Sequence, residues 1–343
     1  MDAPLWTETH APGLADLPQP EVRDRLERAV AEPMNLVVHG PPGVGKTAAV
    51  RAMAREAHED PENDLFELNV ADFFDRTKKE IRTDPRFEPF LSGRSRMAKR
   101  DMINHVLKEV AGYAPVSGQY KTVVLDNAEA IREDFQQALR RVMERHHRTT
   151  QFVVVTRQPS KLIPPIRSRC FPVPVRAPTT DELVALLRRI VEAEGVPHDD
   201  DGLEFVAGYA DGDVRKGVLG LQTTAVEADE VTMNAAYEAL GAVGRDDELR
   251  AVLTAARAGD FDDARSTVAD LLDDGGFDGQ GLLRELLRVA RTEYDGAELA
   301  RLHRLAGRVD LDLATGTDDR LHVARLLADW GAPDATARAT RAD

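Results

Sequence analysis

The sequence is poor in cysteine and lysine and has no long apolar run. Its single cysteine, Cys170, cannot form an internal disulfide, and no Cys/His cluster has metal-ligand spacing, which excludes a disulfide scaffold and a structural zinc site. No stretch reaches about eighteen uncharged apolar residues, and the first residues lack the basic-then-apolar order of a signal peptide. We therefore expect a cytoplasmic protein with no membrane partner.

The charge balance is strongly acidic. Only eight of the 45 basic residues are lysine, against 60 acidic residues and a net charge of −15. A lysine-poor, acidic surface is what a salt-rich cytoplasm favours, so the net charge reports habitat more than function. Such a charge ordinarily argues against nucleic-acid binding, but here only the local charge is informative.

The first half of the chain alternates short apolar runs with longer helical stretches. Near-continuous apolar strands separated by helices predict a parallel sheet covered on both faces. The five runs predicted as buried strands are Met34–His39, Leu65–Asn69, Thr122–Asp126, Phe152–Thr156 and Phe171–Val175.

The strand pattern stops at Pro178, and the rest reads as helices. Thr179 and Glu182 form a capping box before an apolar helical stripe, and Gly195 is placed to end that helix. About five further helical segments follow Gly241. The sequence thus predicts an α/β domain over residues 1–175, a small all-α domain over 176–241 and a second all-α domain over 242–343.

A phosphate-binding loop follows the first strand directly. Its glycines let backbone N–H groups surround a β-phosphate, and the next helix adds partial positive charge. Lys46 is placed to reach the β- and γ-phosphates, and Thr47 to coordinate Mg²⁺. The alternative, a glycine turn that matches by chance, does not explain the strand–loop–helix context. The predicted ATP-binding residues are Gly40, Pro41, Pro42, Gly43, Val44, Gly45, Lys46 and Thr47.

The predicted strand Thr122–Asp126 ends at Asp126, which is placed to hold the Mg²⁺ shell together with Thr47. In P-loop enzymes that hydrolyse nucleotide, the next residue is usually a glutamate that polarises the attacking water. Here it is Asn127, which can hydrogen-bond a water but cannot accept its proton. Glu129 is the alternative base, although it is expected to lie a turn away in the following loop or helix.

Several motifs in order resemble the small subunits of the replication factor C clamp loader, an AAA+ family, in a salt-adapted archaeal form. The resemblance covers nearly the whole chain and includes two stretches, QQALRR and SRC, that are specific to clamp loaders within the wider ATPase class. The motifs are LWTETHAP, GPPGVGKT, FELNVAD, LDNAEA, FQQALRRVMERH, IRSRCF and GDVRKGVLGLQ.

The resemblance implies a Rossmann-like AAA+ P-loop domain, a helical lid and a helical collar that joins subunits into a pentamer. The implied partners are a large subunit, other small subunits, a sliding clamp and primer–template DNA. Arg169 of the SRC triplet corresponds to an arginine finger that acts on a neighbour's ATP. Arg215 corresponds to the lid sensor of the γ-phosphate. A plain surface arginine is the alternative at either position.

The chain departs from the family pattern at the catalytic positions. Besides Asn127, Arg157 stands where the family has a water-positioning asparagine, and LPQP (17–20) replaces the family's VGQ, which leaves the adenine pocket undefined. These losses predict a subunit that binds ATP through a site including Arg157 but hydrolyses it weakly. The rivals are a self-sufficient AAA+ motor, such as a helicase or helicase loader acting as a homo-oligomer, and a helical scaffold with a vestigial loop.

One stretch is locally basic. Residues 73–100 contain nine basic and four acidic side chains, so nine minus four gives +5 within a chain of net −15. In the family this region lines the chamber that tracks DNA, which predicts phosphate contacts. A solvated basic loop is the alternative. The predicted DNA-contacting residues are Arg94, Arg96, Lys99 and Arg100.

Overall fold

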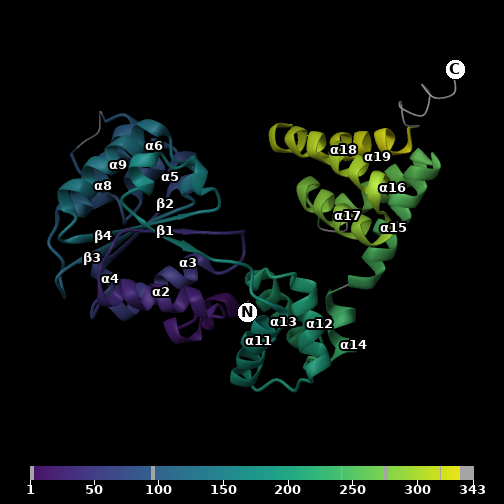
Figure 1. The fold of residues 1–343 in the computed structure, drawn as a ribbon, viewed down its shortest axis with the longest axis horizontal. Coiled ribbons are helices and arrows are strands. Elements are labelled where there is room, and N and C mark those ends of the chain that lie inside the picture. The colour runs from purple at the N-terminus through teal and green to yellow at the C-terminus, as the bar shows by residue number, and fades with distance from the viewer. Residues whose placement is uncertain (1–3, 94–96, 241, 274–276, 317, 333–343) are drawn as a thin grey trace. The chain divides into compact units, whose positions relative to one another are not determined.

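A computed structural model describes residues 4–93, 97–240, 242–273, 277–316 and 318–332. The chain divides into two compact units, residues 1–240 and 241–343. The first contains the sheet and the helices that follow it, and the second is helical (Figure 1).

The first unit is built on a five-stranded, all-parallel sheet in the order β2-β3-β4-β1-β5. The predicted parallel sheet is therefore confirmed. The expectation that all five strands are buried is wrong at the two edges, since only Leu68 of β2 and Val173 of β5 are buried. An edge strand has a neighbour on one side only, which also explains why β5 tolerates two prolines. The strands are β1 Leu36–His39, β2 Leu65–Asn69, β3 Lys121–Asp126, β4 Thr150–Thr156 and β5 Phe171–Pro174.

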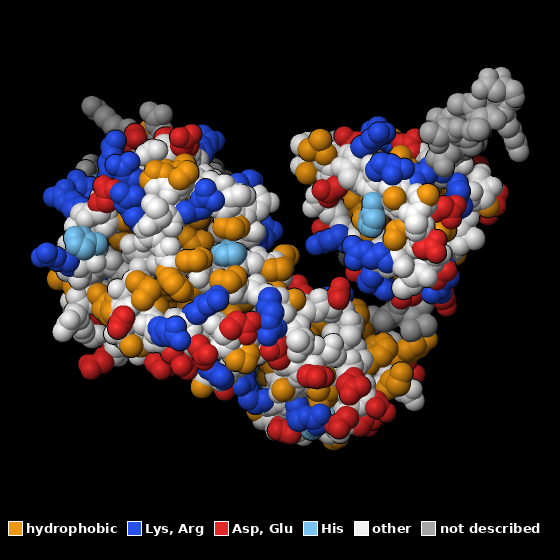
Figure 2. Space-filling view, in the orientation of Figure 1, with side chains coloured by type: hydrophobic (Ala, Val, Ile, Leu, Met, Phe, Trp, Pro, Cys, Tyr) orange, Lys and Arg blue, Asp and Glu red, His pale blue; other side chains and the backbone are white. Residues whose placement is uncertain are grey.

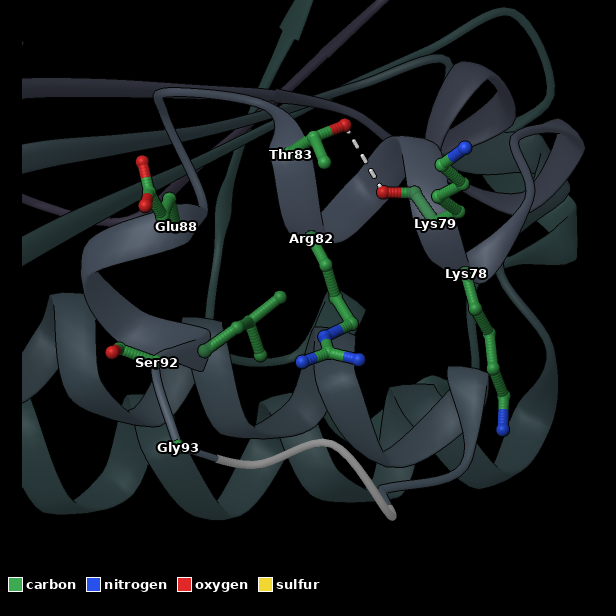
Figure 3. A pocket seen from close by; sticks show the side chains of 8 residues that line it. Lys78, Lys79, Arg82, Thr83, Glu88, Ser92 and Gly93 are labelled. Atoms are coloured by element: carbon green, nitrogen blue, oxygen red, sulfur yellow. Dashed lines mark hydrogen bonds between the residues drawn. The ribbon is translucent and has the colours of Figure 1, made fainter.

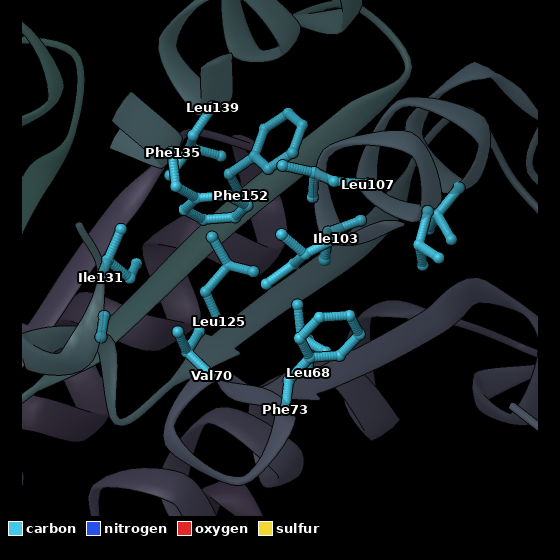
Figure 4. Packing of buried hydrophobic residues seen from close by; sticks show 14 of the residues in the cluster. Leu68, Val70, Phe73, Ile103, Leu107, Leu125, Ile131, Phe135, Leu139 and Phe152 are labelled. Atoms are coloured by element: carbon cyan, nitrogen blue, oxygen red, sulfur yellow. The ribbon is translucent and has the colours of Figure 1, made fainter. Parts of the chain in front are cut away.

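Helices cover both faces of this sheet, each over its own apolar core (Figure 1). Helices α2 (Pro20–Ala31) and α3 (Lys46–Ala57) pack on one face. On the other face Phe152, Leu125 and Leu139 point toward one another (Figure 4). The helices that contribute to this second core are α5 Val70–Asp75, α6 Lys78–Thr83, α7 Glu88–Leu91, α8 Lys99–Gly112 and α9 Glu133–His146. The remaining short helices are α1 Trp6–Thr9, α4 Pro61–Asp64 and α10 Pro164–Arg167, with single 3-10 turns at Leu14–Asp16, Ala128–Ala130 and Pro159–Lys161.

Four helices after the sheet share a separate core, to which Trp6 of α1 contributes. The first of them begins with the predicted capping box: the Thr179 hydroxyl accepts from the N–H of Glu182 at 3.2 Å, and the Glu182 carboxylate accepts from the N–H of Thr179 at 2.8 Å. Gly195, with φ of 70°, ends it as predicted. These helices are α11 Thr180–Glu194, α12 Asp200–Ala210, α13 Val214–Ala228 and α14 Met233–Leu240.

The second unit is a helical bundle centred on the fully buried Trp330. The indole N–H of Trp330 donates to the carbonyl of Leu253 at 3.3 Å, and the guanidinium of Arg257 lies 5.1 Å from the ring centroid. Among the residues described, no helix is both long and apolar enough to cross a bilayer. The helices are α15 Ala242–Ala258, α16 Phe261–Asp273, α17 Gly279–Glu293, α18 Gly296–Thr315 and α19 Asp319–Gly331.

Candidate nucleotide site

The phosphate loop joins the end of β1 to the start of α3, and its backbone leaves no room for side chains at two glycines. A Cβ on Gly40 would meet the carbonyl oxygen of Val175 at 1.9 Å. A Cβ on Gly43, where φ is +72°, would meet the Asp213 carboxylate at 2.0 Å. Gly45 caps α3 in the left-handed region, with φ of 89°. The loop shape therefore depends on glycine itself.

Lys46 is the first residue of α3, and its side chain turns back over the loop. Its ammonium donates to the carbonyl of Pro41 at 2.5 Å. Burial lowers the pKa of Lys46, while the nearby carboxylates of Asp126 and Glu129 act in the opposite direction. A cation in this position suits a polyphosphate, which would supply the negative charge that the loop lacks.

Thr47, in the first turn of α3, lies beside Asp126, the last residue of β3. The Thr47 hydroxyl donates to the Asp126 carboxylate at 2.9 Å. A hydroxyl and a carboxylate are the hard oxygen donors that Mg²⁺ prefers. No group of three or more acidic, His or Cys side chains is placed to hold a metal among the described residues. The donor set therefore fits a magnesium ion that arrives with phosphate oxygens.

Asn127 adopts a left-handed conformation, with φ of 52° and ψ of 44°. Its side-chain amide donates to the Asn69 side-chain oxygen at 3.2 Å, and that oxygen also caps α5 by accepting from the N–H of Asp72. Asparagine is among the few residues that tolerate this backbone region. The residue after Asp126 is thus held by a local turn as well as by its side-chain contact.

Glu129 and Arg157 form an ion pair that the sequence did not predict. The Arg157 Nε donates to one Glu129 oxygen at 2.6 Å, and the Thr156 hydroxyl donates to the other at 2.9 Å. Burial would raise the pKa of Glu129, but these hydrogen bonds outweigh it, so that the pKa lies below its ordinary value. The sequence shows only that Glu129 and Arg157 each follow the end of an apolar strand. The ion pair also requires those two strands to be neighbours in the sheet, which the sequence does not show.

Helix α13 contacts the phosphate loop through its first turn. The backbone N–H of Arg215 donates to the carbonyl of Gly43 at 3.3 Å, and Asp213 caps the helix by accepting from the N–H of Lys216 at 2.9 Å. The Arg215 side chain itself is exposed. The structure thus places the backbone of this predicted sensor at the loop.

Arg169 lies near the amino ends of the strands, whereas the phosphate loop lies at their carboxyl ends. It comes two residues before β5 begins, whereas the loop follows the end of β1, which runs parallel beside β5. Its guanidinium donates to the Glu144 carboxylate at 2.6 Å and to the carbonyl of Pro165 at 2.7 Å, in an exposed turn. The length of a strand therefore separates Arg169 from the phosphate loop of its own chain.

Most of the predicted DNA residues lie outside what the structure describes. Arg94 and Arg96 fall outside the described residues, as does the side chain of Arg100. The ammonium of Lys99 donates to the carbonyl of Phe74 and is partly buried. That contact leaves Lys99 less available to a partner than the sequence suggests.

Elsewhere in this stretch, the described cations fall into two groups. Arg76 and Arg86 both pair with the buried carboxylate of Asp84, whose pKa is lowered to about 2, chiefly by the Arg86 hydrogen bond. The second group, the cavity cations Lys78, Lys79 and Arg82, forms no ion pair with any described residue and lines an open cavity of about 460 Å³ (Figure 3). In the space-filling view, blue side chains gather over the region of α6, α8 and α9 (Figure 2).

Two family models match the chain. Residues 36–175 match the "ATPase family associated with various cellular activities (AAA)", and residues 245–329 match the "Replication factor C C-terminal domain". Among solved structures, the Thermotoga maritima RuvB Holliday junction branch migration motor aligns with a TM-score of 0.54 at 15% identity, over 95% of each chain. At that identity the likeness shows a common fold.

Curated relatives extend the match to nearly full length. The replication factor C small subunit of Halobacterium salinarum is 31% identical over 94% of this chain and 95% of its own. That of Thermofilum pendens is 31% identical over 96% of each, and that of Natronomonas pharaonis 31% over 94% of each. With the loop, the Thr47–Asp126 contact and the helical second unit in place, the chain belongs to the replication factor C small subunit family of AAA+ clamp-loader proteins.

Proposed function

We propose that this subunit binds ATP with Mg²⁺ and helps to load a sliding clamp onto primer–template DNA. The observation that carries the proposal is the complete phosphate loop, with Lys46 above it and the Thr47–Asp126 oxygen pair beside it. When bound, Mg²⁺ would neutralise phosphate charge, and the chain's part is to hold the phosphates and the ion's oxygen donors in place. The partners are a large subunit and other small subunits.

Weak hydrolysis by this subunit's own site is the second part of the proposal. Asn127 cannot take a proton from water, and its amide is already directed to Asn69. The nearest alternative base, Glu129, has both carboxylate oxygens engaged by Arg157 and Thr156. A carboxylate held as the partner of a guanidinium is a poor proton acceptor, because pairing stabilises its charged form.

The third part is an arginine finger supplied to a neighbouring subunit. Arg169 is exposed and lies near the amino ends of the strands, away from its own phosphate loop, which favours action on the ATP site of a neighbouring subunit. Arg215 is proposed as the lid residue that senses the terminal phosphate, since its backbone already contacts Gly43. We further propose that residues 1–175, 176–241 and 242–343 serve as ATPase, lid and collar of a cytoplasmic hetero-oligomer.

ATPase measurement on the purified chain separates this proposal from a self-sufficient motor. General-base loss lowers rates by roughly 10²–10⁴, so the chain alone should turn over slowly, and Glu129→Gln should leave the residual rate unchanged. Assembly with partner subunits should restore ATPase and clamp loading. A chain that hydrolyses ATP at the rate of ordinary AAA+ enzymes by itself would favour the motor instead.

DNA contact by the basic stretch can be tested through its salt dependence. Changing Arg94, Arg96, Lys99 and Arg100 to alanine in the assembled complex should flatten the slope of log affinity against log salt by up to ~3–4, since each phosphate contact contributes ~0.9. A parallel triple variant at the cavity cations Lys78, Lys79 and Arg82 tests whether these make the contacts instead. Unchanged affinity and slope in both variants would mean a solvated basic loop.

A further inference from the structure

The N-terminal strap, residues 4–19, is anchored in two different cores of the first unit (Figure 1). At one end Trp6 packs in the core of helices α11–α14, and its backbone N–H donates to the Gln222 side-chain oxygen at 2.9 Å. At the other end Leu14 and Leu17 pack in the core between the sheet and helices α2 and α3. The strap therefore joins the α11–α14 bundle to the sheet that carries the phosphate loop.

Two charged contacts hold the strap along α11. The Arg189 guanidinium lies 2.6 Å from the Asp16 carboxylate, and both side chains are close to half exposed. At the last residue of the helix, the Glu194 carboxylate is hydrogen-bonded to the His10 ring. Contacts of this kind are weak and are screened by salt.

A third charged contact joins the start of α11 to α2 through Arg176, which lies between β5 and α11. Its guanidinium donates to both oxygens of Glu182, at 2.6 and 2.7 Å, and its Nε lies 2.8 Å from the carboxylate of Glu21 in α2. The buried side-chain amide of Gln19 donates to the Arg176 carbonyl at 2.9 Å, which fixes the backbone at this point. Because Glu182 and Arg189 are separated by two helical turns, one face of α11 carries both contacts.

The bundle held by these contacts also covers the phosphate loop. The backbone N–H of Arg215 donates to the Gly43 carbonyl, and the Asp213 carboxylate occupies the space that a Cβ on Gly43 would need. At the turn before α13, a Cβ on Gly212 would lie 2.8 Å from the side chain of Ala177. A bundle that moved away from the strap and from α2 would lose these contacts and uncover one side of the loop.

We propose that the strap and Arg176 form a charged latch that holds the α11–α14 bundle over the phosphate loop, and that opening of this latch controls the exchange of bound nucleotide. The apolar anchors keep the two parts joined, while the ion pairs of Arg176 and Arg189 set their closed position. Since exposed ion pairs are weak, they can break without unfolding either core. This inference rests on the proposed binding of ATP and adds how the site opens.

The rate of nucleotide release tests the latch without relying on hydrolysis. The full chain is loaded with mant-ADP, a fluorescent diphosphate, and Mg²⁺, and is then mixed with excess ADP in a stopped-flow fluorimeter. Arg176→Ala, which removes two ion pairs, should speed release about threefold to tenfold, and Arg189→Ala about twofold to fivefold. The matched control is Arg188→Ala, which should leave the rate unchanged because the ion pair of Arg188 with Asp200 lies within the bundle.

Salt gives a second measure of the same latch. Release from the wild type should become faster between about 0.1 M and about 1 M salt, because screening weakens the ion pairs. The Arg176→Ala/Arg189→Ala double variant should show a smaller rise, whereas Arg188→Ala should follow the wild type. An equal rise in the double variant and the control would contradict the latch.

Hydrogen exchange without nucleotide separates opening of the bundle from nucleotide binding. Peptides that contain the first turn of α13 should exchange faster in Arg176→Ala and Arg189→Ala than in the wild type or Arg188→Ala. Equal exchange in all four proteins would overturn the latch, and faster exchange with unchanged release would overturn its control of nucleotide exchange. If exchange responds as expected but the wild type binds no mant-ADP, the latch holds the bundle and it is the proposed ATP binding that fails.

Discussion

The nucleotide site has two halves, one shaped by the backbone and one shaped by side chains. The half formed by β1 and α3 is set by backbone: Gly40 and Gly43 have no space for a Cβ, and Lys46 turns over the loop they shape. The half formed by the ends of β3 and β4 is shaped by side chains, among them the Asn127 amide that donates to Asn69 and the Arg157–Glu129 ion pair. We therefore expect nucleotide binding and hydrolysis to be separable in this subunit, because a phosphate-binding loop can survive changes to the residues that activate water.

The largest expected effect uses a residue outside both halves. Arg169→Ala should leave this subunit's own ATP affinity unchanged but reduce hydrolysis at the neighbouring site by roughly 10³ or more, the usual contribution of an arginine finger. The total rate of the complex falls less, because other sites dilute the loss. Steady-state ATPase of the assembled complex, with assembly checked by native mass measurement, gives the result.

The control for that experiment is Arg167→Ala, which removes an exposed arginine from the same turn region. It should not change the rate. A complex that carries Arg169→Ala and hydrolyses ATP normally would show that this arginine is an ordinary surface residue.

The next effect tests the backbone-shaped half. Lys46→Ala should weaken ATP binding by ~1.5–3 kcal/mol, about 10–100-fold, because a charge-assisted contact to phosphate is lost. Calorimetry on the purified chain measures it, with thermal unfolding to confirm that the variant is folded. Equal ATP affinity in wild type and variant would contradict the role of the loop.

The smallest effect tests the side-chain half. Asn127→Glu should lower the free energy of unfolding by about 1 kcal/mol, since glutamate is less tolerant of the left-handed region than asparagine. Asn127→Gly, which suits that backbone, serves as the matched control in urea unfolding. Turnover should stay low in Asn127→Glu and rise only in the Asn127→Glu/Arg157→Asn double variant. Full activity from the single change would show that one residue alone limits hydrolysis.

The sequence by itself determined the features that consecutive residues encode. The five strands, the strand–loop–helix phosphate motif and the capping box at Thr179 were all predictable, because each depends on neighbours within a few positions. The proximity of Thr47 to Asp126 is also consistent with the sequence pattern, since Thr47 begins the helix after β1 and Asp126 ends β3, a parallel strand of the same sheet. The ordered motifs likewise identified the family before any geometry was known.

Only the tertiary structure decided the contacts that depend on strand order and on where α13 packs. Arg157 meets Glu129 because β4 lies directly beside β3, and Asp213 reaches Gly43 because α13 packs against the loop. The left-handed turn at Asn127 and the inward contact of Lys99 were equally hidden in the sequence. Each of these contacts joins residues from different elements or depends on the conformation of a turn. Composition and periodicity do not show which elements become neighbours in the fold.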